Sequence, residues 1–277
     1  MSNASGSTFN QSAGDIIIDG NDNFATGTSV ASSTPMLGFG TSSLSFSTGT
    51  INLTGGAITF VDPHVATTAG SGYTIYAYLA SGMNFDAAAA HTIKFGNGVS
   101  TQQGGNTNGF YYYLYAGSGR LNLGSVIVNN PSGTNRNVTQ YISSGIMNGD
   151  LTVTAGTYSQ NALQTNIGGN LTVANGAVLG GTGGIKGTVT INPGGKIQPG
   201  VDGIGILTDS TGVTLLSGAI AEMDINPSAK TNDLLKVTGG NITLNGTLSI
   251  NTLGSGIFKI GDSFKLFEAN TYSGNFS

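Results

Sequence analysis

Short triplets of the form apolar–polar–apolar recur along the whole chain and constrain its fold more than any other feature. Alternation with a period of two places the outer residues of a triplet on a buried face and the middle residue in solvent, as in a β-strand. Most triplets are bounded by Gly or Asn, which tolerate the left-handed conformation that a sharp corner demands. The triplets are Leu44-Ser45-Phe46, Ile51-Asn52-Leu53, Ile58-Thr59-Phe60, Ile93-Lys94-Phe95, Leu121-Asn122-Leu123, Leu151-Thr152-Val153, Leu171-Thr172-Val173, Val189-Thr190-Ile191, Val213-Thr214-Leu215, Ile242-Thr243-Leu244 and Leu248-Ser249-Ile250.

The distance between triplets separates two kinds of all-β fold. Hairpin folds repeat their turn signals every 8–12 residues, and Asn175-Gly176 is one pair that would permit a local hairpin. A recurring unit of about 20 residues fits instead the rung of a parallel β-helix, which holds two or three short strands. We therefore predict an all-β fold, a right-handed parallel β-helix (β-solenoid) that forms a single elongated domain on the order of 60 Å long at about 4.8 Å per rung. Separations of 20, 18 and 24 residues join the triplets that begin at Leu151, Leu171, Val189 and Val213.

The pattern changes along the chain and predicts three regions. Residues 1–40 are rich in Ser, Thr and Gly and are expected to form an N-terminal cap or flexible segment, because a solenoid must cover its end rungs. Residues 41–200 carry the regular rungs, and 201–277 form a C-terminal segment with longer strands such as "AIAEMDIN". The best helix signal is "NFDAAAAHTIKF" (84–95), but four alanines make barely one turn, so we expect a loop or a short helix there.

Composition excludes several classes of partner. The chain has 277 residues, and charged residues make up 8% of them, against about 25% in an ordinary soluble domain. The nine Lys and Arg residues are scattered singly and the net charge is −4, so we expect neither nucleic-acid binding nor docking on anionic membranes. No apolar run is long enough to span a bilayer, and the absence of cysteine excludes disulfides and thiolate metal sites.

Four segments of the second half share Gly-rich corners and short strands: "GGTGGIKGTVTINPGGKIQPG" (180–200), "GIGILTDSTGVTLLSGAIAEMDIN" (203–226), "TNDLLKVTGGNITLNGTLSIN" (231–251) and "GDSFKLFEANTYSGNFS" (261–277). These segments resemble the passenger regions of bacterial autotransporters, the autotransporter-associated β-strand repeat family. The resemblance is strongest for 150–277. It implies an exported, surface-exposed β-helix that is part of a longer protein and whose export signal lies outside this chain; it implies no particular activity.

Histidine offers little material for catalysis. Only His64 and His91 could act as an imidazole base, and no G-x-S-x-G or H-E-x-x-H motif occurs. Asp62 lies two residues from His64 and could orient it, but Pro63 between them indicates an edge or a turn. We interpret His64 as a solvated or structural residue and expect no catalytic residue and no cofactor.

Two acidic groups are candidates for a polysaccharide-cleaving or calcium-binding site. "DIIIDGNDN" contains Asp15, Asp19 and Asp22, and its stretch Asp19-Gly20-Asn21-Asp22-Asn23 is similar to an oxygen-rich calcium loop. We interpret it instead as an Asx-rich turn whose side chains bond their own backbone. Glu222 and Asp224 share one face of a strand, where a solvated outer face is the simpler interpretation. A glycosidase needs two carboxylates at a controlled separation, one with a raised pKa. We expect no metal site.

The tyrosines are the strongest candidates for a ligand site. "FYYYLY" (110–115) places Tyr111, Tyr113 and Tyr115 on one face of a strand, and Tyr73, Tyr76 and Tyr78 lie upstream. An exposed row would offer flat surfaces with polar tips for sugars or protein partners. The alternative is a buried aromatic ladder, in which Tyr76 and Tyr113 would be about two rungs apart.

The resemblance implies an exported protein of a bacterial cell surface, extracellular or on the outer surface, and the repeat pattern without catalytic motifs predicts a structural or adhesive role for it. The rod would act as a stiff, non-catalytic scaffold that could bind surface polysaccharide or the surface of a host or neighbouring cell. It could also bind a second copy of itself through its end rungs. Two alternatives stay open: a polysaccharide-active β-helix enzyme (a lyase or glycoside hydrolase) and a self-assembling extracellular fibre subunit.

Overall fold

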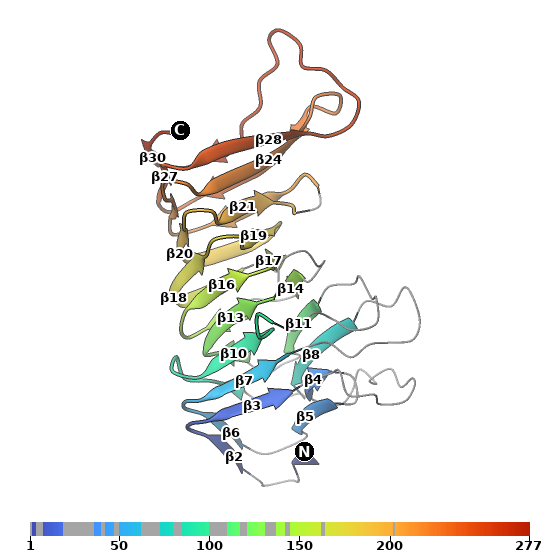
Figure 1. The fold of residues 1–277 in the computed structure, drawn as a ribbon, viewed down its shortest axis with the longest axis vertical. Coiled ribbons are helices and arrows are strands. Elements are labelled where there is room, and N and C mark those ends of the chain that lie inside the picture. The colour runs from blue at the N-terminus through green and yellow to red at the C-terminus, as the bar shows by residue number, and fades with distance from the viewer. Residues whose placement is uncertain are drawn as a thin grey trace.

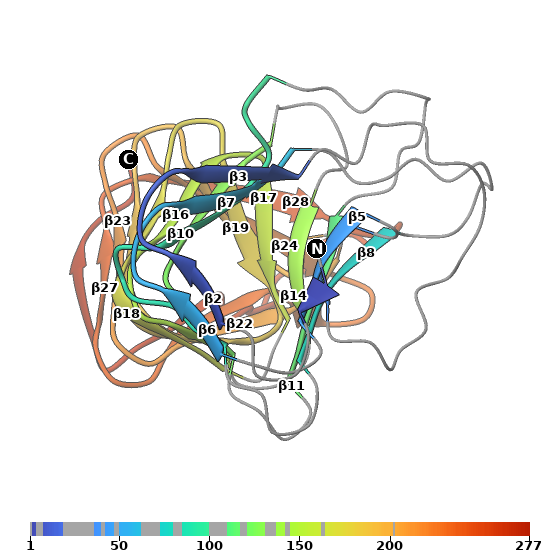
Figure 2. The same ribbon diagram turned by 90° about the horizontal axis from the view of Figure 1, so that it is seen from below.

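A computed structural model of the chain describes residues 2–3, 8–18, 36–39, 42–46, 50–61, 73–79, 85–99, 110–116, 121–130, 137–141, 145–161, 164–201 and 203–277. The described residues form β-strands, turns and loops and contain no helix, so none that could span a membrane. Nearly all strand pairs are parallel and join sequentially distant segments, which gives an elongated molecule with stacked rungs (Figure 1). Seen from the N-terminal end, successive strands turn around a central core (Figure 2). The predicted right-handed parallel β-helix is confirmed.

Each rung contributes strands to three columns, which we number in chain order. Column 1 carries the strand that opens a rung, and its neighbours pair in parallel. At the N-terminal end, β6 is joined to the next rung by the isolated bridge between Leu53 and Ala87. Column 1 consists of β2 (Thr8–Gln11), β6 (Thr50–Leu53), β9 (Phe85–Asp86), β12 (Leu121–Leu123), β15 (Gly145–Met147), the first parts of β18 (Thr165–Val173) and β20 (Gly184–Ile191), β22 (Ile206–Asp209), β26 (Leu234–Val237) and β29 (Phe267–Glu268).

Column 2 is the most regular of the three and contains most of the triplets. In β18 and β20 one long strand serves both columns, with a register shift where it turns the corner. Column 2 consists of β3 (Asp15–Ile18), β7 (Ala57–Phe60), β10 (Thr92–Phe95), β13 (Ser125–Asn129), β16 (Leu151–Ala155), the second parts of β18 and β20, β23 (Val213–Leu215), β27 (Asn241–Leu244) and β30 (Thr271–Gly274).

Column 3 closes each rung and contains the exceptions to parallel pairing. Strand β4 is antiparallel to both of its neighbours, and β25 (Thr231–Asn232) folds back antiparallel on β24. Column 3 consists of β1 (Ser2–Asn3), β5 (Ser42–Phe46), β4 (Met36–Phe39), β8 (Tyr73–Leu79), β11 (Phe110–Ala116), β14 (Asn137–Tyr141), β17 (Thr157–Gln160), β19 (Val178–Gly181), β21 (Lys196–Pro199), β24 (Ile220–Asn226) and β28 (Thr247–Thr252).

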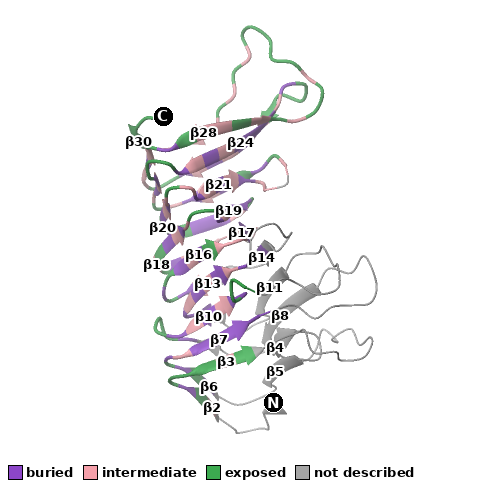
Figure 3. Cartoon of the chain, viewed as in Figure 1, coloured by how far each residue is buried: buried purple, intermediate pink, exposed green. Residues whose placement is uncertain are grey.

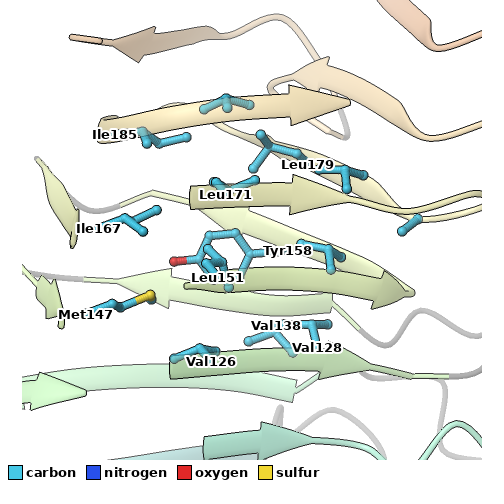
Figure 4. Packing of buried hydrophobic residues seen from close by; sticks show 14 of the residues in the cluster. Val126, Val128, Val138, Met147, Leu151, Tyr158, Ile167, Leu171, Leu179 and Ile185 are labelled. Atoms are coloured by element: carbon cyan, nitrogen blue, oxygen red, sulfur yellow. The ribbon is translucent and has the colours of Figure 1, made fainter. Parts of the chain in front are cut away.

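The core is built from stacked rows of apolar side chains inside the rod (Figure 4), and buried residues recur along the strands of successive rungs (Figure 3). Because parallel strands pair in register, each outer residue of a triplet lies above its equivalent in the rung below, and Phe60 stacks on Phe95 with ring centroids 5.7 Å apart. Burying each aliphatic side chain contributes about 1.5–3 kcal/mol. The first row of column 2 runs Ile16, Ile58, Ile93, Val126, Leu151, Leu171, Val189, Val213 and Ile242.

Tight corners require glycine at particular positions. Gly181 has φ +106° at the end of β19, and a Cβ there would collide with the backbone of Gln160. Gly56 has φ +77°, and its Cβ would collide with the carbonyl oxygen of Gly14 in the preceding rung. At both positions another residue would be strained and would also push neighbouring rungs apart.

The described part of the segment 84–95, residues 85–95, forms two strands joined by a turn, so the short helix considered for it is wrong. Strands β9 and β10 flank a turn at Ala89-Ala90. The turn is closed by one hydrogen bond, from the His91 N–H to the Ala88 carbonyl, and the preceding backbone bonds to other rungs: the N–H of Ala87 donates to the Asn122 carbonyl, and that of Ala88 to the Leu53 carbonyl. Hydrogen bonding between rungs therefore overrides the local preference of alanine for helix.

The rungs are longer than the sequence spacing suggests. Ile16 to Tyr272 covers nine rung spacings, at about 28 residues each, because segments between some strands lengthen the early rungs. Column 2 is therefore about 43 Å from first to last strand, shorter than the length predicted from 20-residue rungs. Strands β2 and β3 already belong to the columns, which also continue through residue 200. The division at residues 40 and 200 stays a prediction.

Candidate functional site

The tyrosine-rich strand β11 lies in column 3 between β8 and β14. Its Cα register places Tyr113 opposite Tyr76 on one side and Tyr141 on the other, and Tyr115 opposite Tyr78. Tyr76 and Tyr113 are thus in adjacent rungs, so the expected separation of two rungs is wrong. The two tyrosines are 37 positions apart in the sequence, yet their strands pair directly. The side chains of all these tyrosines lie outside the described part of the structure.

Several predicted candidates fall outside the described residues, namely His64 and Asp62 as well as Asp19 and Asp22. Asp15 is described: it opens β3 and its carboxylate is 3.6 Å from the ammonium of Lys94. Within the described residues, no group of three or more His, Asp or Glu side chains is arranged to hold a metal ion.

His91 is a buried structural residue, which the sequence did not reveal. Its Nε2 is 3.1 Å from Oε1 of Gln11, and the Gln11 amide donates to the carbonyl oxygens of Gly14 (3.0 Å) and Ala57 (2.9 Å). Because the amide nitrogen is occupied as a donor, Oε1 must accept, so His91 carries its proton on Nε2. Burial lowers the pKa of His91 below its ordinary value. The ring therefore joins the first rungs as a neutral group and is enclosed from any substrate.

Glu222 and Asp224 do not form the solvated acidic face expected from their alternation in the strand. Glu222 forms an ion pair of 2.6 Å with Lys196 of the neighbouring strand, and Asp224 is buried. The reason is β25, which folds back on β24 and brings Asp233 over it, so that the Asp233 N–H donates to the carbonyl of Asp224. The short antiparallel strand β25 therefore covers Asp224, which the alternation in the sequence places on the solvent side of the strand.

Asp233 is fully buried and holds two backbone segments together. Its Oδ1 accepts from the N–H of Gly205 and its Oδ2 from the N–H of Asp224, both at 2.8 Å. Burial, opposed by these two hydrogen bonds and assisted by the charges of Asp224 and Glu222, raises the pKa of Asp233 to about 6. Both oxygens are occupied by the backbone, so this carboxyl acts as a structural clamp and has no free oxygen for acid–base chemistry.

Asp209 is the second buried carboxyl with a raised pKa. One oxygen caps the turn after β22 by accepting from the N–H groups of Thr211 and Gly212, and the other is enclosed without a partner. Burial raises the pKa of Asp209 to about 6 despite these backbone hydrogen bonds. In the sequence Asp209 is an aspartate before a turn, and that pattern does not indicate burial.

An open groove runs across the strands β15, β18 and β20 and the turn after β22. Its volume is about 510 Å³, within the range of roughly 300–1,000 Å³ found for ligand sites. Lys186, Asn166, Thr188 and Thr211 supply its polar lining, and Ile167 belongs to its apolar lining. Asn166 and Lys186 are in register on neighbouring rungs. No local sequence pattern indicates this groove, because its lining comes from four rungs between residues 146 and 211 and meets only through rung stacking.

No family model matches the chain, and a search of curated proteins finds no match either. The fold defines the protein as a parallel β-solenoid. The resemblance to autotransporter passengers stays a prediction.

Proposed function

We propose that this chain is a stiff, non-catalytic scaffold exported to a bacterial cell surface, where it holds its loops and side faces away from the cell body. The observation that carries the proposal is the unbroken stacking of column 2 from β3 to β30. Ladder hydrogen bonds and apolar rows run the length of the rod without disulfides. Such a structure resists bending because each rung is fixed to both neighbours.

The buried carboxyls support a scaffold over a polysaccharide-cleaving enzyme. Asp233 is occupied by backbone donors, and Asp209 is 1% exposed and caps its own turn. Neither faces the groove, which is lined by amide, hydroxyl, lysine and apolar side chains.

Limited proteolysis combined with small-angle X-ray scattering tests the scaffold. We expect an elongated particle and a protease-resistant fragment that contains β16 to β28. Rapid cleavage within those strands, or scattering from a compact sphere, would contradict the proposal. Incubation with acidic and neutral polysaccharides should release no new reducing ends, whereas release would support the enzyme alternative.

A second candidate function is adhesion through the tyrosines of β11. The register that stacks Tyr76, Tyr113 and Tyr141 in consecutive rungs favours it, because it concentrates aromatic residues on one part of column 3. Replacing Tyr111, Tyr113 and Tyr115 together by Ser should abolish binding to a panel of bacterial and host polysaccharides. Unchanged binding by this variant would exclude the tyrosines of β11 as the binding site.

A further inference from the structure

The groove between β15 and β22 combines features that point to a ligand. It crosses four successive rungs, so it extends over three rung spacings, about 14 Å along the rod. Glycines at its corner, Gly168, Gly169 and Gly187, leave the surface without side chains there. The groove is therefore open at the surface and elongated, which suits a segment of a chain.

Lys186 supplies a positive charge with no counter-ion. Its side chain forms no ion pair or hydrogen bond with any described residue, whereas five other described lysines each have an acidic partner. Lys186 is exposed and lines the groove. An unpaired ammonium at the edge of a polar groove is the natural partner of a carboxylate.

The other polar groups of the groove are neutral. Oδ1 of Asn166, next to Lys186, is enclosed without a hydrogen-bond donor, so a rotation of the amide toward a ligand hydroxyl would cost no existing bond at that oxygen. The hydroxyls of Thr188 and Thr211 make no hydrogen bond within the described residues and face the same groove. One cation beside several uncharged donors and acceptors matches a sugar that carries one carboxylate and many hydroxyls.

The polar surface continues from the groove onto column 2. Thr188 lies two residues before Thr190, whose outward position is in register with Thr172 and Thr214 in the neighbouring rungs. The hydroxyls of these three threonines have no hydrogen-bond partner within the described residues. A polymer that leaves the groove would therefore meet further free hydroxyls at intervals of one rung, about 4.8 Å.

We propose that this groove binds a segment of an acidic polysaccharide, with a uronate carboxylate on Lys186 and sugar hydroxyls on Asn166, Thr188 and Thr211. A nucleic acid fits less well, because its affinity depends on several cations along the phosphates, whereas the groove has one and the chain carries a net charge of −4. The site goes beyond the scaffold function and is separate from the tyrosines of column 3.

Isothermal titration with a short oligogalacturonate tests the site. The wild type should bind, and Lys186→Gln should weaken binding about tenfold or more, because a hydrogen bond to a charged group is lost. Lys259→Gln is the matched control: Lys259 is exposed in the loop after β28, and its ammonium has no ion-pair partner among the described residues. This control should leave the affinity within twofold of the wild type.

A second set of measurements separates the groove from general attraction of anions. Thr188→Val, which keeps the side-chain shape, should weaken oligogalacturonate binding without changing the urea midpoint of unfolding. A neutral cello-oligosaccharide and an oligothymidylate of equal length should not bind measurably. Full affinity in Lys186→Gln, equal losses in both lysine variants, or oligothymidylate binding as tight as the uronate would each overturn the proposal. A rod-shaped particle in scattering would leave the scaffold function intact in every one of these cases.

Discussion

Buried polar side chains decide how single rungs are joined in this protein. Gln11 and His91 join the first rungs, and Asp233 joins the segments around β22 and β24. Midway between them, Gln160 donates to the Thr165 hydroxyl and to the carbonyl of Gly184, both at 3.0 Å, and accepts from Tyr158. Gln11, Gln160 and Asp233 each bond to at least one other rung and so fix the relative position of rungs, which apolar rows alone would not determine.

Replacing Asp233 by Asn should destabilise the protein by about 2–4 kcal/mol. An amide has one acceptor oxygen, so the N–H of either Gly205 or Asp224 would lose its partner and face an NH₂ group instead. Urea unfolding followed by circular dichroism measures the change. The control Asp15→Asn removes an exposed ion pair and should cost at most about 0.5 kcal/mol. Equal small effects in the two variants would show that Asp233 is not a clamp.

The two ends of the rod should respond to pH in opposite directions. The pKa of Asp209 and of Asp233 is raised to about 6, so each binds its proton more tightly in the folded state. Their stabilisation is present below pH about 4 and is lost as pH rises through 6, on the order of 3 kcal/mol for each group. The pKa of His91 is lowered, so its contribution is present above pH 6.5 and is lost as the pH falls below that value.

Native-state hydrogen exchange at pH 5.5 and 7.5, corrected for intrinsic rates, measures this contrast. At pH 5.5 the amides of β22 and β26 should be more protected, and those of β7 and β10 less protected. A change of the same sign in both regions would contradict these assignments.

At the scale of the strand, the inward triplet positions carry the stability. Leu171 of β18 is fully buried between Leu151 and Val189 in the neighbouring rungs. Leu171→Ala should cost about 2–5 kcal/mol through lost burial and the remaining cavity. Thr172→Ala changes the outward residue of the same strand and should cost less than about 1 kcal/mol. Urea midpoints of the two variants check the difference, and similar values would place the triplets outside the core.

Strand prediction from the sequence succeeded where local pattern and rung stacking agree. All eleven triplets lie in strands, because an apolar–polar–apolar segment forms a stable strand wherever one of its two faces packs against a core. It failed where distant segments decide: the covering of Asp224 by β25 and the burial of Asp209 depend on tertiary contacts. The adjacency of Tyr76 and Tyr113 could not be predicted, since the length of a rung does not follow from sequence spacing. The groove could not be predicted either, because which residues meet in neighbouring rungs also depends on the rung lengths.

The whole molecule is a single stack of rungs, and column 2 is the side of the stack whose strands pair without interruption. Ten strands, from β3 to β30, keep their register through parallel pairing, and the corner glycines let neighbouring rungs approach. The central claim is therefore geometric: residues far apart in sequence lie at multiples of one rung spacing, with little variation.

Distances between spin labels test that claim most directly. The chain has no cysteine, so labels at Lys94→Cys and Thr243→Cys would be the only ones. These outward positions of β10 and β27 are separated by six rung spacings through β13, β16, β18, β20 and β23. Double electron–electron resonance should give one narrow peak near 29 Å, allowing for label length. A broad distribution, or a peak that does not shorten in proportion when Thr243→Cys is replaced by Thr214→Cys, would contradict the stacked rod.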